Sequence, residues 1–241
     1  MIPRIIHYTW FGGAEKPKRV KQQIESWKFK LPDYHFIEWN ESNYDISTIN
    51  SKYVQEAYEK QMWAFVTDYV RLDVLRQYGG IYLDTDVQVI KSFDSLLEQG
   101  SFIGKESEYT LCTAVIGAEP NSKWLIDLLL DYDKRSFKRK DGGVDKTPNS
   151  KYLLQFFGIS SSSQVNNFSK IEGVKFYPFD FFSPINFATG EKKITNNTYA
   201  IHHYSGTWKN KRGKSKDFIL RVITRLIGEK KVERLKRYLH K

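Results

Sequence analysis

The sequence has little that could cross-link the chain or anchor it through a membrane. A single cysteine, Cys112, excludes both an intramolecular disulfide and a cysteine-rich zinc site. No apolar run approaches the length of a transmembrane helix, and the opening residues M-I-P-R-I-I-H-Y are too short and too broken for a signal peptide. We therefore expect a cytoplasmic protein. Its 241 residues, 40% of them hydrophobic, suffice for one large core.

The first 208 residues also lack a net charge. The stretch 209–241 holds 13 of the 38 lysines and arginines but only 3 of the 28 acids. The rest therefore carries 25 charges of each sign, and the C-terminal stretch accounts for the whole excess of +10. We predict one folded domain at 1–208 and a basic tail at 209–241.

The stretch 62–90 has the clearest pattern in the chain. In its first part, apolar residues recur at three- and four-residue steps, which predicts a helix with one buried face. Gly79 and Gly80 end this helix, because glycine adopts the left-handed conformation of a helix cap without a steric penalty. A short apolar strand at 81–83 follows, and 87–90 resumes an extended run.

Two acids, Asp84 and Asp86, follow the short strand. In an extended segment, side chains two residues apart point the same way, and at the carboxyl end of a strand in an open α/β sheet they face the ligand crevice. Two such carboxylates repel each other unless a cation or a hydroxyl-rich ligand lies between them. The pair predicts a site for a hard divalent cation that also binds phosphate oxygens. An isolated D-x-D is otherwise typical of a polar turn between hairpin strands.

Asp68 and Arg71 lie one helical turn apart on the preceding helix and share a face. One interpretation is a surface ion pair that contributes a few tenths of a kcal/mol. The other is a pair that faces the crevice and binds ligand. The apolar neighbours on the helix and the two acids that follow it favour the second interpretation.

The remaining segments alternate between strands and helices, which predicts an α/β fold with a central sheet flanked by helices. Strands are predicted at 2–8, 34–39, 101–105, 111–117, 174–177 and 199–203. Helices are predicted at 18–27, 53–60, 93–97, 122–132 and 151–157. The polar segment 138–150 is expected to be a loop, and the serine run 160–163 a linker.

A glycine pair follows the first predicted strand, directly after Thr9, Trp10 and Phe11. Such a pair lets the backbone approach a ligand closely, and an indole ring offers a face on which a base can stack. A plain turn beside a core tryptophan would explain the same residues.

His202 and His203 end the last predicted strand. Neighbouring side chains of an extended segment face opposite ways, so only one ring can reach the crevice, where a ring nitrogen could bind a metal. A histidine pair in packing or at the surface is the alternative.

The run D-x-x-R followed by G-G-x-Y-x-D-x-D, at 68–86, resembles the sugar-binding region with the DXD motif of family 32 glycosyltransferases. The opening I-P-R-I-I-H-Y-T-W-F-G-G is similar to the start of that family, and H-H-Y-S-G-T-W is a looser match to its end. The family includes initiating mannosyltransferases and bacterial transferases of capsular and cell-surface polysaccharides, with glucosylating clostridial toxins as distant relatives. The resemblance implies a single GT-A-type, Rossmann-like domain with a central mixed sheet.

The resemblance also implies an enzyme, a retaining hexosyltransferase, and gives roles to the candidate residues. Asp86 would bind Mn²⁺ or Mg²⁺, with Asp84 supporting the metal and holding ribose or sugar hydroxyls. Asp68 and Arg71 would hold the transferred sugar, and Tyr82 would shape the pocket.

Thr9 and Trp10 would border the nucleotide base. The remaining roles fall on the late residues, with a metal contact from His202 or His203 and diphosphate contacts from Ser205 and Trp208. A histidine ligand favours Mn²⁺, which accepts a mixed shell of oxygen and imidazole better than Mg²⁺ does.

The expected donor is a UDP-hexose, with GDP-mannose as the second candidate, and the expected acceptor is a saccharide or a lipid-linked saccharide. A sugar-nucleotide hydrolase, or a binding module that keeps only the donor site, is the alternative. Thr113 stands near the position where related enzymes carry an asparagine that contacts the donor sugar, which leaves that contact open.

The tail predicts basic amphipathic helices, with an apolar stripe at 218–227 and lysines and arginines on the opposite face. Such a helix suits the surface of an anionic membrane, where each cation contributes about 1 kcal/mol. A peripheral position on the inner face of the cell membrane would fit a lipid-linked acceptor. In one alternative the stripe docks on the domain. In another the tail binds nucleic acid, which the scarcity of aromatic residues in it disfavours.

Overall fold

The computed structural model describes residues 1–206, 211–228, 231–232 and 234. Its strands are β1 (Ile5–Thr9), β2 (His35–Trp39), β3 (Gly80–Leu83), β4 (Val87–Val89), β5 (Phe102–Ser107), β6 (Thr110–Ala118), β7 (Lys170–Ile171), β8 (Val174–Tyr177) and β9 (Ala200–His202). Its α-helices are α1 (Lys18–Lys30), α2 (Lys52–Glu59), α3 (Trp63–Tyr78), α4 (Asp94–Leu97), α5 (Lys123–Asp133), α6 (Asn149–Phe156), α7 (Phe179–Phe182) and α8 (Lys211–Ile227). Two 3₁₀ turns, η1 (Ile46–Thr48) and η2 (Ser162–Gln164), complete the elements.

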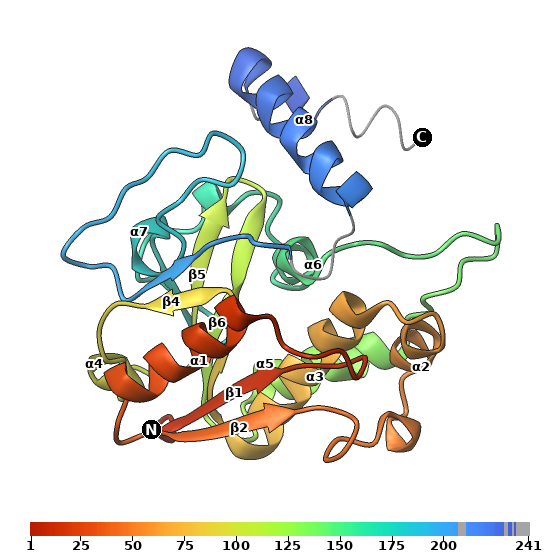
Figure 1. Cartoon of the computed structure of the whole chain (residues 1–241), viewed down its shortest axis with the longest axis horizontal. Coiled ribbons are helices and arrows are strands. Elements are labelled where there is room, and N and C mark those ends of the chain that lie inside the picture. Colours follow the sequence, from red (N-terminus) through yellow and green to blue (C-terminus); the bar gives the residue numbers. More distant parts are fainter. Residues whose placement is uncertain (207–210, 229–230, 233, 235–241) are drawn as a thin grey trace.

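Seven strands form one mixed sheet in the order β2-β1-β3-β6-β5-β8-β7, while β4 and β9 pair separately (Figure 1). Helices α2, α3, α5 and α6 contribute to the core on one face, and α1, α4 and α7 to the core on the other. The predicted α/β fold, with a central mixed sheet flanked by helices, is confirmed.

The directions of the strands bring several chain segments to one edge of the sheet. Strand β1 runs parallel to both β2 and β3, and β6 runs antiparallel to both β3 and β5. The carboxyl ends of β1, β3 and β5 therefore meet at the same edge, which is where α/β sheets bind ligands.

The face of helix α3 that was predicted to be buried is buried up to Leu75, and over the middle turns the other faces are buried as well. Its buried residues run almost without interruption from Phe65 to Leu75 and include Asp68, Arg71 and Asp73. The helix packs between the sheet and the helices α2 and α5, which leaves no face to solvent over its middle turns.

The glycine pair ends α3 as predicted. Gly79 has φ +63°, and its N–H donates to the carbonyl of Leu75 at 2.9 Å. Gly80 has φ +100°, and a Cβ there would lie 2.6 Å from the carbonyl oxygen of Ile5. Both the backbone conformation and the close approach of β1 therefore require glycine.

The D-x-D segment is a tight turn, whereas the sequence predicted an extended segment. Thr85 and Asp86 occupy the turn, and the Val87 N–H donates to the carbonyl of Asp84 at 2.9 Å. Strand β4 leaves the main sheet after this turn and pairs with β9. The need to change sheets explains why the chain turns directly after β3.

The serine run 160–163 is also not a linker. It forms part of η2, where a capping box joins Ser161 and Gln164, and Ser162 is buried with its hydroxyl donating to the carbonyl of Ser107 at 2.6 Å. Helix α7 was not predicted from the sequence.

Helix α8 contacts the domain through arginines. The Arg225 Nε donates to the Thr189 carbonyl at 2.7 Å, and the Arg221 guanidinium lies 4.3 Å from the ring centre of Phe187. Most of the apolar stripe remains exposed, including Phe218 (69%) and Leu226 (78%). The stripe at 218–227 is therefore largely not docked on the domain. Among the described residues, no helix has the length and apolar character that a membrane span requires.

Candidate active site

A pocket of about 470 Å³ opens at the edge of the sheet where β1, β3 and β5 end. Its size is that of a small-molecule site. The predicted residues that line it are Thr9, Trp10, Asp68, Arg71, Tyr82, Asp84, Asp86, Thr113 and His202. His203 and Ser205 do not line it.

Asp84, Asp86 and His202 converge in this pocket. Each offers a ligand atom, and these atoms lie within 4.8 Å of one another. The tight turn brings the two carboxylates together, and the pairing of β4 with β9 places His202 opposite Val87, next to Asp86. Residues more than a hundred positions apart thus form one cluster.

Asp86 is held in place by Ser205. The Ser205 N–H donates to Asp86 Oδ2 at 2.7 Å, and the Ser205 hydroxyl donates to the same oxygen at 3.0 Å. Burial alone would raise the pKa of Asp86, but the His202 ring and the two donors of Ser205 hold it well below its usual value. Asp86 is therefore ionised at neutral pH.

His202 lies between two carboxylates. Its Nε2 is 3.4 Å from Asp86 Oδ1, and its Nδ1 is 3.2 Å from Glu106 Oε1. Burial lowers the pKa of His202, but the two acids raise it to about 10. Glu106 was not predicted. It directly follows the predicted strand 101–105, and the same signal that identified Asp84, an acid at the end of a strand, could have found it.

The cluster fits a divalent metal by its chemistry. Two carboxylates and an imidazole are a suitable donor set for Mn²⁺ and, apart from the imidazole, for Mg²⁺. Asp84, Asp86 and the Nε2 of His202 would hold the ion once it displaces the proton that the two acids favour on Nε2, and Glu106 would orient the ring through Nδ1. A second group, Glu106, Cys112 and His202, is less suited, because burial raises the pKa of the Cys112 thiol well above its usual value.

Arg71 connects the helix to the D-x-D turn. Its Nη2 lies 3.2 Å from Asp68 Oδ1 and 3.4 Å from Asp84 Oδ1, and its Nη1 donates to the carbonyl of Thr113 at 2.6 Å. Only 5% of Arg71 is exposed, so the interpretation of Asp68 and Arg71 as a surface ion pair is excluded.

Asp68 is fixed by a residue that the sequence did not single out. The backbone N–H of Asn149 donates to Asp68 Oδ2 at 3.2 Å, and the Asn149 amide donates to the Asp68 carbonyl at 3.1 Å. Burial raises the pKa of Asp68 to about 6, against the opposing effects of Arg71 and this N–H. Asn149 was hidden at the end of the predicted loop 138–150, and it is instead the first residue of α6.

Tyr82 links β1 to the acids. Its hydroxyl donates to Asp84 Oδ1 at 3.0 Å and lies 3.1 Å from Thr9 Oγ1, and the Arg71 guanidinium sits 4.7 Å from its ring centre. Trp10 lines the pocket, and its Nε1 donates to the carbonyl of Ala14 at 2.6 Å.

The other predicted residues lie elsewhere. The Nε2 of His203 is 2.9 Å from Gln88 Oε1, so its ring is directed away from the cluster. Trp208 lies outside the described residues. At Gly12, the group in close approach is the ring of Trp63, whose Nε1 would be 2.6 Å from a Cβ.

Residues 17–103 match a family described as the glycosyltransferase sugar-binding region containing the DXD motif. The chain carries this DXD region. It includes Asp68, Arg71, Asp84 and Asp86, so the resemblance predicted from the sequence is confirmed over this region. Thr9, Glu106 and His202 reach the pocket from outside the DXD region.

Curated relatives share this part of the chain. Inositol phosphoceramide mannosyltransferase 3 of Schizosaccharomyces pombe is 28% identical over 138 residues, which cover 56% of this chain and 38% of that protein. An uncharacterized glycosyltransferase of Acanthamoeba polyphaga mimivirus is 27% identical over 201 residues, 77% of each chain. This chain thus spans well under half of the mannosyltransferase. Among solved structures, galactosyltransferase LgtC in complex with donor and acceptor sugar analogs covers 90% of this chain and 95% of its own, with 17% identity and a TM-score of 0.48.

Proposed function

We propose that this protein is a metal-dependent retaining glycosyltransferase that moves a hexosyl unit from a nucleotide sugar to a saccharide or lipid-linked saccharide. The observation that carries the proposal is the convergence of Asp84, Asp86 and His202 with the Asp68–Arg71 pair in one pocket. The DXD region and the names of the relatives support the same activity. Synthesis of a capsular or cell-surface polysaccharide is the proposed setting.

The acids and the histidine would hold Mn²⁺ or Mg²⁺ beside the diphosphate of the donor. When bound, the ion neutralises the diphosphate and stabilises it as a leaving group. Ser205 keeps Asp86 Oδ2 hydrogen-bonded, which orients the other oxygen of Asp86 toward His202. The proposed role of Ser205 is therefore to position Asp86. For Trp208 we propose the role expected from the resemblance, a contact with the diphosphate.

Asp68 and Arg71 are placed to bind hydroxyls of the transferred sugar. Their side chains are fixed by Asn149 and Thr113, so little conformational entropy is lost when a ligand binds. Thr9 and Trp10 line the pocket at the end of β1, where we place the nucleotide base.

The state of the carboxylates supports retention by front-side attack. Asp68 and Asp84 are bound to Arg71, and Asp86 and Glu106 to His202. A double displacement requires a carboxylate that attacks the anomeric carbon, and the proposed roles in metal binding, sugar binding and orientation of His202 leave none of these four acids for it. In the proposed reaction the acceptor oxygen attacks the anomeric carbon as the diphosphate leaves, and a diphosphate oxygen takes the acceptor proton. The anomeric configuration of the product, read by NMR, tests retention against inversion. A glycosyl-enzyme detected by mass spectrometry during turnover would contradict front-side attack, because only a double displacement forms that intermediate.

Two nucleotide sugars are candidates for the donor. A UDP-hexose is the donor expected from the sequence, and the mannosyltransferase names of several relatives favour GDP-mannose. A thermal-shift screen of UDP, GDP and their sugar conjugates, with and without Mn²⁺, separates them. A nucleotide at 100 times its Kd should stabilise the fold by about 2.7 kcal/mol.

The stabilisation should depend on Mn²⁺ and be absent from Asp86→Asn. Asp141→Asn is the matched control, because this acid is exposed and remote from the pocket. Release of nucleoside diphosphate should increase when acceptor is added. Release that no acceptor accelerates would instead identify a hydrolase, and the absence of any nucleotide effect would refute the transferase.

We further propose that α8 holds the enzyme at an anionic membrane surface, on the inner face of the cell membrane. The arginines Arg221 and Arg225 attach the helix to the domain, so the apolar stripe is directed outward. The tail carries 13 basic residues and 3 acids, which gives it the charge that attracts anionic lipid. A lipid-linked acceptor would then lie in the same surface.

Flotation with vesicles tests this placement. We expect binding to vesicles that contain phosphatidylserine, little binding to neutral vesicles, and a loss of at least tenfold in Phe218→Ser with Leu226→Ser. Phe29→Ser is the control, since Phe29 is 83% exposed and lies on α1. Equal binding of both variants, or retention of the protein by nucleic acid instead of vesicles, would overturn the proposal.

A further inference from the structure

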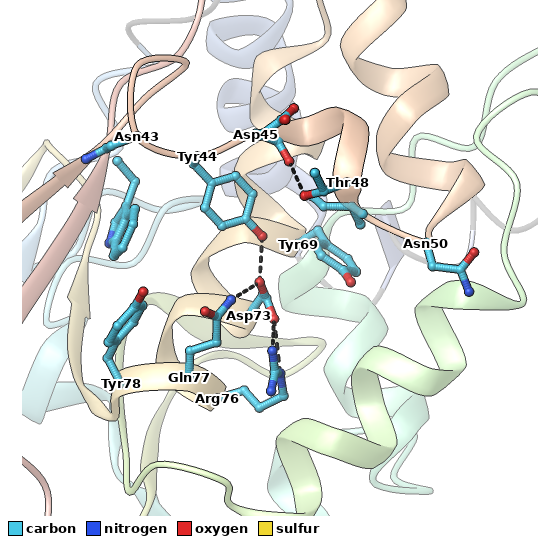
Figure 2. A pocket seen from close by; sticks show the side chains of 12 residues that line it. Asn43, Tyr44, Asp45, Thr48, Asn50, Tyr69, Asp73, Arg76, Gln77 and Tyr78 are labelled. Carbon is cyan, nitrogen blue, oxygen red and sulfur yellow. Dashed lines mark hydrogen bonds and ion pairs between the residues drawn. The ribbon is translucent and has the colours of Figure 1, made fainter.

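A second pocket, of about 370 Å³, lies beside the C-terminal half of α3 (Figure 2). Its walls come from the end of β2, the turn around η1, and the last turns of α3. It shares no lining residue with the candidate active site. We name it the Tyr78 pocket.

Most of the α3 side chains that line the Tyr78 pocket project away from the active site. At about 100° per residue, Tyr69, Asp73 and Gln77 project on the side of α3 opposite Asp68 and Arg71, whereas Tyr78 projects near the direction of Arg71 but lies about two turns further along the helix. The two pockets are separate because they have no lining residue in common.

Aromatic rings form one wall of the Tyr78 pocket. The rings of Trp39 and Tyr78 stack with their centres 5.4 Å apart and an angle of 28° between their planes. Trp39 is buried, while Tyr78 is 44% exposed. Both rings line the pocket, and the exposed part of Tyr78 offers an aromatic surface against which the partly positive C–H groups of a sugar can pack.

Polar groups held in a fixed network form the opposite side (Figure 2). Asp73 Oδ1 accepts from Arg76 Nε at 3.0 Å and Nη2 at 2.8 Å, and Asp73 Oδ2 accepts from the Tyr44 hydroxyl at 2.7 Å and Gln77 Nε2 at 2.6 Å. Four donors saturate this carboxylate. The network fixes the side chains of Arg76 and Gln77 but leaves part of each unused.

Several hydrogen-bonding atoms at the pocket have no partner among the described residues. They are the Gln77 amide oxygen, the Arg76 Nη1, the Tyr69 hydroxyl and the Asn50 amide. Three of them belong to planar groups, the amides of Gln77 and Asn50 and the guanidinium of Arg76, and such groups can bond two neighbouring hydroxyls at once.

The charges of the lining restrict the ligand. Arg76 is neutralised by Asp73, and Asp45 adds a further negative charge, so an anion such as a phosphate is disfavoured. A metal ion is disfavoured as well, because Asp73 has no oxygen lone pair left for it. A neutral ligand with many hydroxyls satisfies both restrictions.

We propose that the Tyr78 pocket is a non-catalytic glycan-binding site, in which a neutral sugar packs on Tyr78 and bonds to Gln77, Arg76 and Asn50. The choice of a sugar among neutral polyols rests on the proposed glycosyltransferase function. The site would hold a part of the acceptor or product chain away from the reacting end, which raises the local concentration of acceptor.

Saturation-transfer NMR tests the site directly. The probes are methyl glycosides of glucose, galactose and mannose, together with their di- to tetrasaccharides, without any nucleotide. We expect at least one probe to bind the wild type and Asp86→Asn equally. Tyr78→Ala should weaken that binding at least tenfold, whereas Tyr78→Phe, which keeps the ring, and Phe29→Ala, which removes an exposed ring elsewhere, should not.

Binding that survives Tyr78→Ala, or that UDP or GDP with Mn²⁺ abolishes, would place the sugar in the active site and overturn the inference. Failure of every probe to bind would also overturn it. The proposed function is judged separately by the nucleotide thermal shift. A protein that binds sugar at Tyr78 but no nucleotide would retain the glycan site and lose the transferase assignment.

Discussion

Helix α3 carries two Asp-x-x-Arg pairs five residues apart, Asp68–Arg71 and Asp73–Arg76. In both, the arginine Nη2 approaches the aspartate Oδ1, at 3.2 Å in the first pair and 2.8 Å in the second. The sequence spacing is thus the same, although Asp73 accepts from both Nε and Nη2 of Arg76, while the Nε of Arg71 donates to the Thr67 carbonyl instead of Asp68. Only the first pair belongs to the DXD motif pattern, and only the first faces the candidate active site.

The difference between the pairs lies in what surrounds them. Arg71 also contacts Asp84 and the Thr113 carbonyl, and 6% of its side chain is exposed. Arg76 has no second acid within ion-pair distance among the described residues, and 34% of its side chain is exposed. In the first case one cation faces two carboxylates, whereas in the second the charges cancel and neutral groups complete the network.

An Asp-x-x-Arg pair therefore acquires its chemistry from the residues around it, which for the first pair come from the end of strand β3. Asp84 at the end of β3 leaves the first pair with excess negative charge next to Asp86, which is an environment suited to a cation. The second pair stabilises a polar wall instead.

Replacement of each arginine by methionine should give the largest difference in stability and activity between the two pairs. Arg71→Met leaves the buried Asp68 and the partly buried Asp84 close together without a cation, so we expect a loss of about 3–5 kcal/mol in unfolding free energy and no transferase activity. Arg76→Met should cost about 1 kcal/mol, because its pair is partly exposed. It should leave kcat unchanged, because Arg76 does not line the active site, with any effect confined to the KM for a glycan acceptor. Urea denaturation and a product assay measure both effects. Equal losses in the two variants would contradict the distinction.

Acid should affect the surroundings of the two pairs in opposite ways. His7 donates from Nε2 to the Gly79 carbonyl at 2.8 Å and accepts at Nδ1 from Trp39 Nε1 at 3.0 Å, beside the Tyr78 pocket. Burial lowers the pKa of His7 to about 4. The unfolded chain therefore takes up this proton first, and stability falls as the pH drops below about 6.5, by about 2 kcal/mol at pH 5.

Asp68 should contribute with the other sign. Its pKa is raised by burial to about 6, so the folded protein takes up a proton before the unfolded chain does, and stability rises as the pH falls through 6. Denaturation curves between pH 7 and pH 5 check both signs. The acid-induced loss should be smaller in His7→Asn and larger in Asp68→Asn than in the wild type, and shifts in the same direction would refute the assignment.

Loss of a single hydroxyl is the smallest change, and it should affect catalysis at the first pair but not at the second. Tyr82 donates to Asp84, and Tyr44 donates to Asp73. Each Tyr→Phe variant should lose about 1 kcal/mol of stability, because one acceptor of a carboxylate is left unpaired. Tyr82→Phe should also lower kcat/KM about tenfold, and Tyr44→Phe should not. Kinetic measurements on the two variants, with stability measured in parallel, test the difference.

Much of the candidate site could be predicted because its residues follow strands or sit within one helix. The acids at 84 and 86, the Asp68–Arg71 pair and Tyr82 lie within one short stretch, where strand ends and helical spacing are visible in the sequence. Glu106 and Asn149 could not be recognised in the same way. Their importance depends on contacts with His202 and Asp68, and each contact joins segments about eighty to a hundred residues apart.

The sequence by itself determined the α/β class, the end of α3 at Gly79 and the position of the D-x-D acids. These follow from periodicity and backbone conformation, which act over a few residues. Tertiary structure alone decided that His202 rather than His203 joins the acids, because the pairing of β9 with β4 sets which ring faces Asp86. Tertiary structure also decided which Asp-x-x-Arg pair faces the active site. The two pairs have the same spacing in the sequence, and the sequence of the helix does not show what packs against each of its faces.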